Sequence, residues 1–399
     1  MRAITAAIVL GLLGATPAAA QQPLPQIAPE RTWPELKEAV QERVNRQGYP
    51  LTGFDAGEVR QILDRITSRD PEEWARSWSA AGETHFAAAE AAKAGDPAKA
   101  RKEYLEAWKY FGFGAWPAQT SPGKKASHLR GLEAFRGYIK LADPPIEIIR
   151  VPFEGKEIVA YLQLPKDAIK PAPLVISVGG LDSYKEYVVD QYGPIYMKAG
   201  IAYLAIDMPG TSEAPLLIDV GAERMFSRLL DHLRTRADID ANRVVIQGVS
   251  FGGHWSARVA YTEASRLKGA VVWAGPTDGY FQRDWQAKAL GTREYLFDLF
   301  AARAAVYGVK TLGEYLDYVP RMSLRTAGLL DKPTPAMLLV NGAKDSQVPI
   351  DDLYILMKSG SPKEAWVNPE GGHVGRNREW SDNRIFAEVI VSWISRTLR

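Results

Sequence analysis

The chain has 399 residues, of which 46% are hydrophobic and 24% are charged, and it contains no cysteine. These fractions are ordinary for a globular protein and exclude disordered and collagen-like architectures. A net charge of +2 gives no general reason to expect a nucleic-acid or membrane-surface partner. Because domains average about 150 residues, the length predicts two modules or one large domain with an attachment.

Residues 1–20 have the pattern of an export signal. Arg2 supplies a positive charge, residues 6–15 form an apolar stretch, and residues 18–20 are three alanines that suit a cleavage site. Since a bilayer span needs about 20 apolar residues, we expect this stretch to be removed rather than to stay as an anchor. The sequence therefore predicts a periplasmic or secreted protein whose mature form has no membrane span.

Residues 21–142 are predicted to form an N-terminal helical module. Thr32 and Glu35 make a capping-box pair ahead of apolar residues at helical spacing. Asp70 and Asp96 each precede a proline, which is typical of an N-cap followed by the first helical position. Five of the 11 tryptophans lie between residues 33 and 116, so this module has a large aromatic face to bury.

From residue 143 to residue 399, short apolar runs alternate with helical stretches. Residues 146–153 and 158–164 predict a hairpin. Further runs suit strands that are buried on both faces of a parallel sheet: residues 173–178, 202–206, 244–246, 270–273 and 336–340. Helices are expected over residues 222–236, after Ser250 and over residues 384–398. The alternation predicts a doubly wound, mostly parallel α/β sheet.

Residues 248–253, Gly-Val-Ser-Phe-Gly-Gly, carry the strongest chemical signal. They follow a predicted strand and precede a predicted helix, which is the context of a G-x-S-x-G nucleophile turn. A side chain at either flanking glycine would collide with the tight turn, which exposes the hydroxyl of Ser250. The amide of Phe251, at the helix start, points toward a developing oxyanion.

A serine nucleophile needs a histidine base and an acid that orients it. In proteins with a nucleophile turn of this kind, the serine comes first along the chain, the acid second and the histidine last. Of the five histidines, His373 fits this order, because it lies in a loop before the last predicted helix. Asp345, in the loop after the strand over residues 336–340, is the predicted acid, and Asp278 is the alternative. His254 follows the serine by one helical turn, so we expect it in the pocket wall.

A second oxyanion donor is expected in the glycine-rich loop after the strand over residues 173–178. Gly180 or Leu181 would supply the amide, and the sequence does not choose between them. Asp207 also follows a strand and is interpreted as stabilising a turn. No metal-ligand spacing, phosphate-binding loop or dinucleotide fingerprint occurs, so we expect neither a metal nor a cofactor.

Together these motifs resemble the α/β-hydrolases grouped with the fermentation/respiration switch protein-like esterases and the dihydroxypseudooxynicotine hydrolase. The features that carry the resemblance are the Trp-rich helices, residues 151–156, residues 179–186 (Gly-Gly-Leu-Asp-Ser-Tyr-Lys-Glu), the serine turn, Asp345 and His373. The resemblance implies an α/β-hydrolase fold, a Ser250–Asp345–His373 triad, an oxyanion site near Gly180 and Phe251, and a helical cap. The members of this group include carboxylesterases, enzymes that cleave a carbon–carbon bond beside a carbonyl, and enzymes that shorten polyketides.

Residues 277–330 are too long for a simple connection and are predicted to form a helical excursion. They are rich in aromatic residues, and we expect Tyr280, Phe281 and Trp285 to line a pocket over Ser250 together with His254.

The sequence thus predicts an exported serine hydrolase that acts on an ester of a bulky or aromatic small molecule. It leaves open a homodimer, hydrolysis of a carbon–carbon bond by the same triad, and a non-catalytic binding protein on the same fold.

Overall fold

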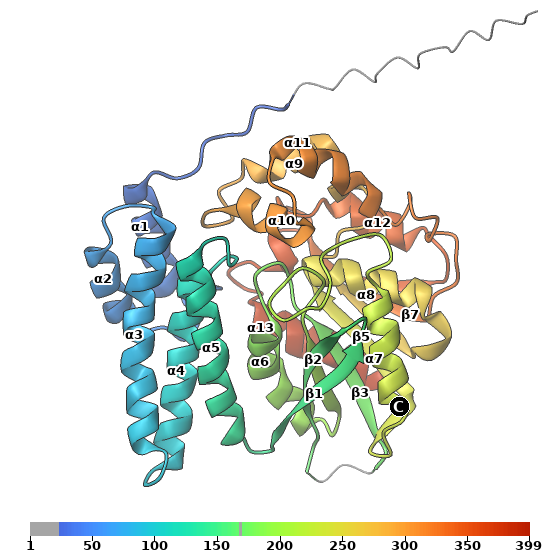
Figure 1. Ribbon diagram of the computed structural model, residues 1–399. Helices are drawn as coiled ribbons and strands as arrows, with labels where there is room; N and C mark the ends of the chain where they lie inside the picture. The colour runs from blue at the N-terminus through green and yellow to red at the C-terminus, as the bar shows by residue number, and fades with distance from the viewer. Residues whose placement is uncertain (1–23, 167–169) are drawn as a thin grey trace, which may run out of the picture.

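The computed structural model describes residues 24–166 and 170–399, and Figure 1 shows a helical bundle beside an α/β body. The bundle contains α1 (Trp33–Asn45), α2 (Ala56–Arg65), α3 (Pro71–Ala92), α4 (Pro97–Ala115) and α5 (Pro122–Lys140). Asp70 and Asp96 are the N-caps of α3 and α4, as predicted, and each carboxylate accepts a hydrogen bond from an amide of the first helical turn. The predicted export signal, residues 1–20, lies outside the described residues.

An eight-stranded sheet forms the centre of the body. Its strands lie in the order β1 (Ile146–Phe153), β2 (Lys156–Gln163), β4 (Ala202–Ile206), β3 (Ala172–Val178), β5 (Ile239–Val249), β6 (Gly269–Trp273), β7 (Ala336–Gly342) and β8 (Lys363–Asn368). The β1–β2 and β2–β4 pairs are antiparallel, and the remaining pairs are parallel. This mostly parallel sheet with helical crossovers confirms the predicted doubly wound α/β fold.

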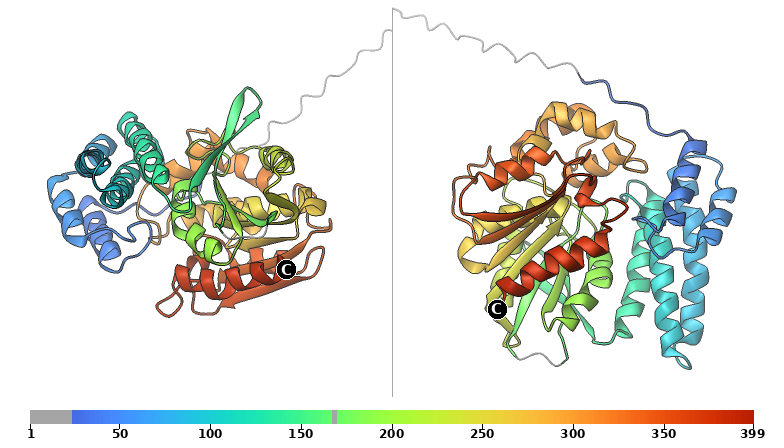
Figure 2. Two further views of the ribbon diagram at one scale, coloured as in Figure 1. Left: turned by 90° about the horizontal axis from the view of Figure 1, so that it is seen from below. Right: turned by 180° about the vertical axis from the view of Figure 1, so that it is seen from behind.

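Helices cover both faces of the sheet, as the two further views show (Figure 2). One face packs against α7 (Arg224–Leu233), α8 (Phe251–Thr262) and α12 (Ile350–Met357). The other face packs against α6 (Lys185–Lys198) and the C-terminal run of α13 (Asp382–Ile385), η5 (Phe386–Val391) and α14 (Ser392–Thr397). Alternate strand residues face alternate layers: Leu174 and Ile176 belong to the first core, and Val175 belongs to the second.

The N-terminal bundle docks on the second core. Tyr104 of α4 and Phe135, Tyr138 and Ile139 of α5 pack with Tyr161 of β2 in that cluster. A separate aromatic core, which includes Trp74 and Trp78, holds the bundle together. The tryptophan-rich helices therefore bury their aromatic side chains mainly within the bundle.

The predicted excursion lies between β6 and β7 and contains η2 (Gly279–Phe281), α9 (Arg283–Leu290), α10 (Leu299–Tyr307), α11 (Leu312–Tyr318) and η3 (Val319–Met322). In Figure 1 these helices cover one end of the sheet, beside the bundle. Strand β8 was not predicted, because it is a partly exposed edge strand whose apolar run, residues 365–367, is short. No helix within residues 24–166 and 170–399 is long and apolar enough to span a membrane.

Candidate active site

The Ser250 hydroxyl lies on a sharp turn between β5 and α8. Strand β5 ends one residue before it and α8 begins one residue after it, and Ser250 itself has φ of 54° and ψ of −123°. A Cβ at Gly248 would lie 2.0 Å from the carbonyl oxygen of Gly252, and one at Gly252 would lie 2.3 Å from that of Gly179. Only glycine fits at both flanking positions, so the turn depends on the pattern seen in the sequence.

The structure brings the three predicted triad side chains into one hydrogen-bonded line. His373 Nε2 lies 2.9 Å from Ser250 Oγ, and His373 Nδ1 lies 2.9 Å from Asp345 Oδ2. The other Asp345 oxygen accepts hydrogen bonds from the amides of Gln347 and Val348 at 2.7 and 3.0 Å. These residues follow β5, β7 and β8, whose carboxyl ends meet at one edge of the sheet. A hydroxyl, an imidazole and a carboxylate in this order can generate a serine nucleophile.

Asp278, the alternative acid, lies outside this line. Its carboxylate accepts hydrogen bonds from the Ser323 hydroxyl at 2.6 Å and from Arg325 Nε at 2.7 Å. Asp278 therefore holds the two ends of the excursion together.

Glu294, which the sequence analysis did not single out, anchors the loop that carries the imidazole. Its Oε1 accepts a hydrogen bond of 3.1 Å from the His373 amide, and its Oε2 accepts one from the Ser346 hydroxyl. The Trp273 indole N–H also anchors this loop, because it donates to the Val374 carbonyl oxygen at 2.6 Å. Glu294 thus connects the excursion to the loops of both the base and the acid.

The surroundings of His373 determine its protonation. Burial alone lowers the pKa of this imidazole, because it disfavours the charged form. The carboxylates of Asp345 and Glu294 favour the imidazolium and outweigh burial, so the pKa of His373 lies above its ordinary value. In contrast, burial lowers the pKa of His254 to about 3. His254 therefore stays neutral near pH 7.

Two backbone amides beside Ser250 are candidates to bind an oxyanion. Phe251 is the first residue of α8, so no preceding helical turn offers its amide a carbonyl group. The Gly180 amide is already occupied, because it donates to the Ser183 hydroxyl at 2.8 Å. Within residues 24–166 and 170–399, no protein group accepts a hydrogen bond from the Leu181 amide, and Leu181 lines the same cavity as Ser250. Of the two amides that the sequence left open, the Leu181 amide is therefore the better candidate, because the Gly180 amide already donates a hydrogen bond.

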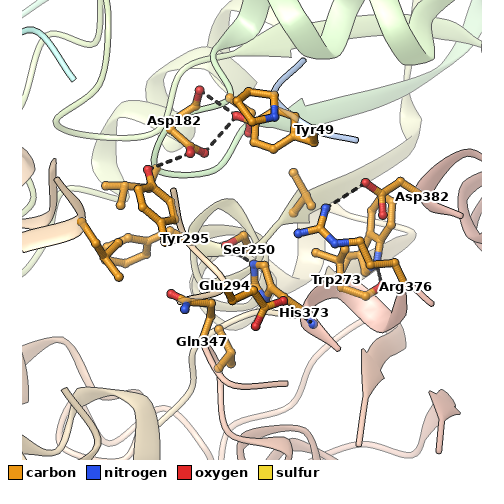
Figure 3. A pocket seen from close by; sticks show the side chains of 18 of the residues that line it. Tyr49, Asp182, Ser250, Trp273, Glu294, Tyr295, Gln347, His373, Arg376 and Asp382 are labelled. Carbon is orange, nitrogen blue, oxygen red and sulfur yellow. Dashed lines mark hydrogen bonds and ion pairs between the residues drawn. The ribbon is translucent and has the colours of Figure 1, made fainter. Parts of the chain in front are cut away.

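Ser250 opens into a cavity whose empty space of about 950 Å³ includes the part that is open to solvent. Three parts of the chain line it. The sheet loops contribute Leu181, Asp182, Ser250 and His373, the N-terminal bundle contributes Arg43, Tyr49, Pro50 and Trp116, and the excursion contributes Tyr280, Glu294, Tyr295, Leu299 and Arg303. Figure 3 shows side chains from all three parts around the serine.

Of the four predicted pocket residues, only Tyr280 lines this cavity. The prediction is wrong for Phe281, Trp285 and His254, which pack behind the wall. Phe281 lies edge-on to the His254 ring, whose Nδ1 is 3.1 Å from the carbonyl oxygen of Pro276. The Trp285 indole N–H donates to a backbone carbonyl at 3.1 Å. The packing of the excursion on α8, rather than aromatic content, decides which rings reach the cavity.

Asp182 is held between tyrosines of the two helical parts, as Figure 3 shows. The Tyr49 hydroxyl lies 2.9 Å from the Asp182 carbonyl oxygen and 3.0 Å from Oδ1, and the Tyr295 hydroxyl donates to Oδ2 at 2.7 Å. Burial raises the pKa of the Asp182 carboxyl, although both tyrosine hydrogen bonds oppose the rise. Because Asp182 directly follows Leu181, these bonds position the candidate oxyanion amide.

A buried ion cluster lies at the other end of residues 179–186. Lys185 Nζ is 2.8 Å from carboxylate oxygens of Glu186, Asp207 and Glu213. Arg136 of α5 donates to Glu213 at 3.1 Å, which ties the bundle to the α/β body. Asp207 is therefore a counterion of a buried lysine and also accepts a hydrogen bond from the Lys185 amide.

Most of the residues that shape the cavity give no recognisable signal in the sequence. Asp182 lies in the motif of residues 179–186, so that motif could have indicated it. The others are single residues of distant helices and loops, and no local pattern distinguishes them: Arg43, Tyr49, Glu294, Tyr295, Arg303 and Arg376. Across the described residues, no group of three or more His, Asp and Glu side chains could hold a metal ion.

Comparisons with known proteins agree with this geometry. Residues 43–366 match the family described as Esterase FrsA-like. Esterase FrsA of Photobacterium profundum is 26% identical over 275 residues, which cover 68% of this chain and 65% of that protein. Hydrolyase poxO of Penicillium oxalicum is 28% identical over 228 residues, which cover 53% of this chain and 54% of that protein. This chain therefore spans about half the length of that relative.

Among solved structures, the 2,6-dihydroxy-pseudo-oxynicotine hydrolase superimposes with a TM-score of 0.72 at 21% sequence identity. The superposition covers 87% of this chain and 93% of that chain. The sheet, the serine turn and this likeness define the fold as that of the α/β-hydrolases. Within that class, the chain belongs to the Esterase FrsA-like family. The resemblance that the sequence motifs indicated is confirmed.

Proposed function

We propose that this protein is a serine hydrolase that cleaves a carboxylic ester of a bulky or aromatic substrate through an acyl-enzyme on Ser250. The observation that carries the proposal is the hydrogen-bonded line from Asp345 through His373 to Ser250. Membership of an esterase family and a cavity wall containing Trp116, Tyr280 and other aromatic residues support it.

In the first half of the reaction, Ser250 Oγ attacks the ester carbonyl carbon while His373 Nε2 takes the hydroxyl proton. Asp345 accepts the Nδ1 hydrogen bond and stabilises the imidazolium. The carbonyl oxygen becomes an oxyanion that the amides of Phe251 and Leu181 bind. His373 then protonates the leaving alcohol, the carbon–oxygen bond breaks, and the acyl group stays on Ser250.

In the second half, His373 Nε2 removes a proton from a water molecule, whose oxygen attacks the acyl carbon. The tetrahedral intermediate uses the same two amides. Its collapse returns the proton from His373 to Ser250 Oγ and releases the carboxylic acid.

Hydrolysis of para-nitrophenyl acetate and butyrate tests the proposal. We expect Ser250→Ala to lower kcat by about 10⁴-fold or more, because the nucleophile is lost. A fluorophosphonate should label Ser250 in the wild type, and peptide mass spectrometry would show the adduct. Equal rates in the two proteins would overturn the proposal.

Two further outcomes identify the alternatives. Cleavage of an aryl β-diketone without ester turnover would assign the triad to carbon–carbon bond hydrolysis. Absence of both turnover and labelling in folded protein would indicate a non-catalytic binding protein.

We also propose that residues 1–20 direct export, on the basis of Arg2, the apolar stretch and the three alanines. Expression of the full chain in a bacterium, followed by N-terminal sequencing of the periplasmic fraction, should give a start near Gln21. Uncleaved protein confined to the cytoplasm would overturn this assignment.

A further inference from the structure

The cavity wall contains a buried guanidinium that no carboxylate of the described residues pairs with. Arg303 lies in α10 and is only 2% exposed. Within residues 24–166 and 170–399, no carboxylate oxygen lies within 4.0 Å of its nitrogens. Its hydrogen bonds go instead to the neutral side-chain oxygens of Gln286, at 2.8 Å, and Gln347, at 3.2 Å. Arginine stays charged in proteins and buried charges are ordinarily paired, so this position suits an anionic group.

Contacts hold the Arg303 side chain in place, and some N–H groups of its guanidinium donate no hydrogen bond to the described residues. Its guanidinium carbon lies 5.1 Å from the centre of the Tyr280 ring. Each terminal nitrogen of the guanidinium bears a second N–H besides the one that it donates to a glutamine, and the buried Nε has no hydrogen-bond partner among the described residues. Arg303, Tyr280 and Gln347 all line the cavity of Ser250. A planar guanidinium presented in this way matches the geometry of a carboxylate or phosphate.

The groove outside the cavity carries an excess of the same charge. Three carboxylates and six arginines line it, the arginines being Arg31, Arg43, Arg46, Arg293, Arg376 and Arg378. Arg43 and Arg376 also line the cavity. Burial, and to a smaller extent the neighbouring arginines, lower the pKa of Arg43 to about 10. Such a groove attracts anions toward the cavity.

We propose that the substrate ester carries an anionic oxygen group, and that Arg303 binds this group inside the cavity while Ser250 attacks the ester carbonyl. This inference rests on the proposed function, because it names the substrate class of the same site. Gln347 bonds Arg303 through its side chain and Asp345 through its amide. The bound anion therefore has a defined position relative to the triad.

Two pairs of size-matched esters test the inference. On the acyl side, mono(para-nitrophenyl) glutarate is compared with para-nitrophenyl pentanoate. On the alcohol side, para-butyryloxybenzoate is compared with its methyl ester. In at least one pair, the wild type should show the higher kcat/KM for the anionic ester, and the pair that does so identifies the side that bears the charge.

Variants of Arg303 then test the residue. Arg303→Gln should lower the ratio of anionic to neutral kcat/KM by about tenfold to a hundredfold, because it removes a charged hydrogen bond. Arg303→Lys keeps the charge without the planar fork and should restore part of the ratio. Arg321→Gln is the matched control: this arginine of the excursion lies 5.2 Å over the Tyr318 ring but is exposed. It should leave the ratio unchanged.

Thermal unfolding of the wild type with added ligands keeps the test decisive if Arg303→Gln fails to fold. Sodium benzoate should raise Tm and its neutral isostere benzamide should not. Sodium phosphate distinguishes the two anions, since a larger rise than with benzoate favours a phosphate-bearing substrate. Equal kcat/KM values for the anionic and the neutral ester of both pairs, with ester hydrolysis intact, would overturn this inference but not the proposed function. Absence of all ester hydrolysis would overturn the proposed function.

Discussion

The sheet and the two helical parts around it contribute differently to the site. The loops after β5, β7 and β8 supply the groups placed to react, Ser250, Asp345 and His373, through two contacts of 2.9 Å. The bundle and the excursion supply none of these groups. They contribute walls and anchors, such as Tyr49 and Tyr295 on Asp182. Substitutions in the sheet loops should therefore change kcat, whereas those in the helical parts should change KM, selectivity and pH dependence.

The largest effect is expected in the sheet loops, at Asp345. Asp345→Asn should lower kcat by about 10³- to 10⁴-fold with little change in KM, because His373 loses the acceptor that orients it and stabilises its charge. Steady-state kinetics on a para-nitrophenyl ester measures this. Asp278→Asn is the control, since Asp278 bonds Ser323 and Arg325. A similar loss of kcat in both variants would contradict the assignment of the acid.

The pH dependence of kcat/KM tests whether the excursion influences the pKa of His373. His373 acts as a base in its neutral form, and neighbouring carboxylates raise its pKa above the ordinary value. Activity should therefore be lost as the pH falls through this raised pKa, so the acidic limb of kcat/KM lies at higher pH than for an ordinary histidine.

Glu294→Gln keeps an oxygen acceptor for the His373 amide but removes the charge that stabilises the imidazolium. The acidic limb of kcat/KM should shift to lower pH, while the rate on the plateau changes much less than in Asp345→Asn. An unchanged profile would show that the excursion does not influence the base.

A smaller effect is expected from the tyrosines that hold Asp182. Tyr49→Phe and Tyr295→Phe each remove a hydrogen bond worth about 1 kcal/mol, so each should change kcat/KM by about fivefold. Because both act on one carboxylate, the double variant should deviate from additivity, and a double-mutant cycle measures the deviation. Strict additivity would mean that the two helical parts act independently.

The smallest effect concerns the docking of the bundle. The Arg136 side chain, bonded to Glu213, is 40% exposed, so Arg136→Gln should lower the free energy of unfolding by about 0.5 kcal/mol. Urea denaturation measures this change. Arg224→Gln, at an exposed pair with Glu154, is the matched control within the α/β body. A loss of several kcal/mol for Arg136→Gln alone would show that this ion pair is essential for docking.

Much of the fold was predictable because its signals are local. The N-caps Asp70 and Asp96 precede prolines, and the strands buried on both faces are apolar runs. Strand β8 was missed because an edge strand needs no long apolar run, and the run in β8 is short. Its side chains are partly exposed, so alternation and hydrophobicity are both weak there.

The sequence by itself determined the fold class, the serine turn and the chain order of Ser250, Asp345 and His373. These features depend on short-range sterics and on connectivity along the strands. Only the tertiary structure decided that the Gly180 amide is occupied, that Phe281 packs behind the wall and that Arg303 is bonded to neutral glutamine side chains rather than to a carboxylate of the described residues. The physical reason is that these properties depend on side-chain directions where distant segments meet, and no spacing along one segment encodes those directions.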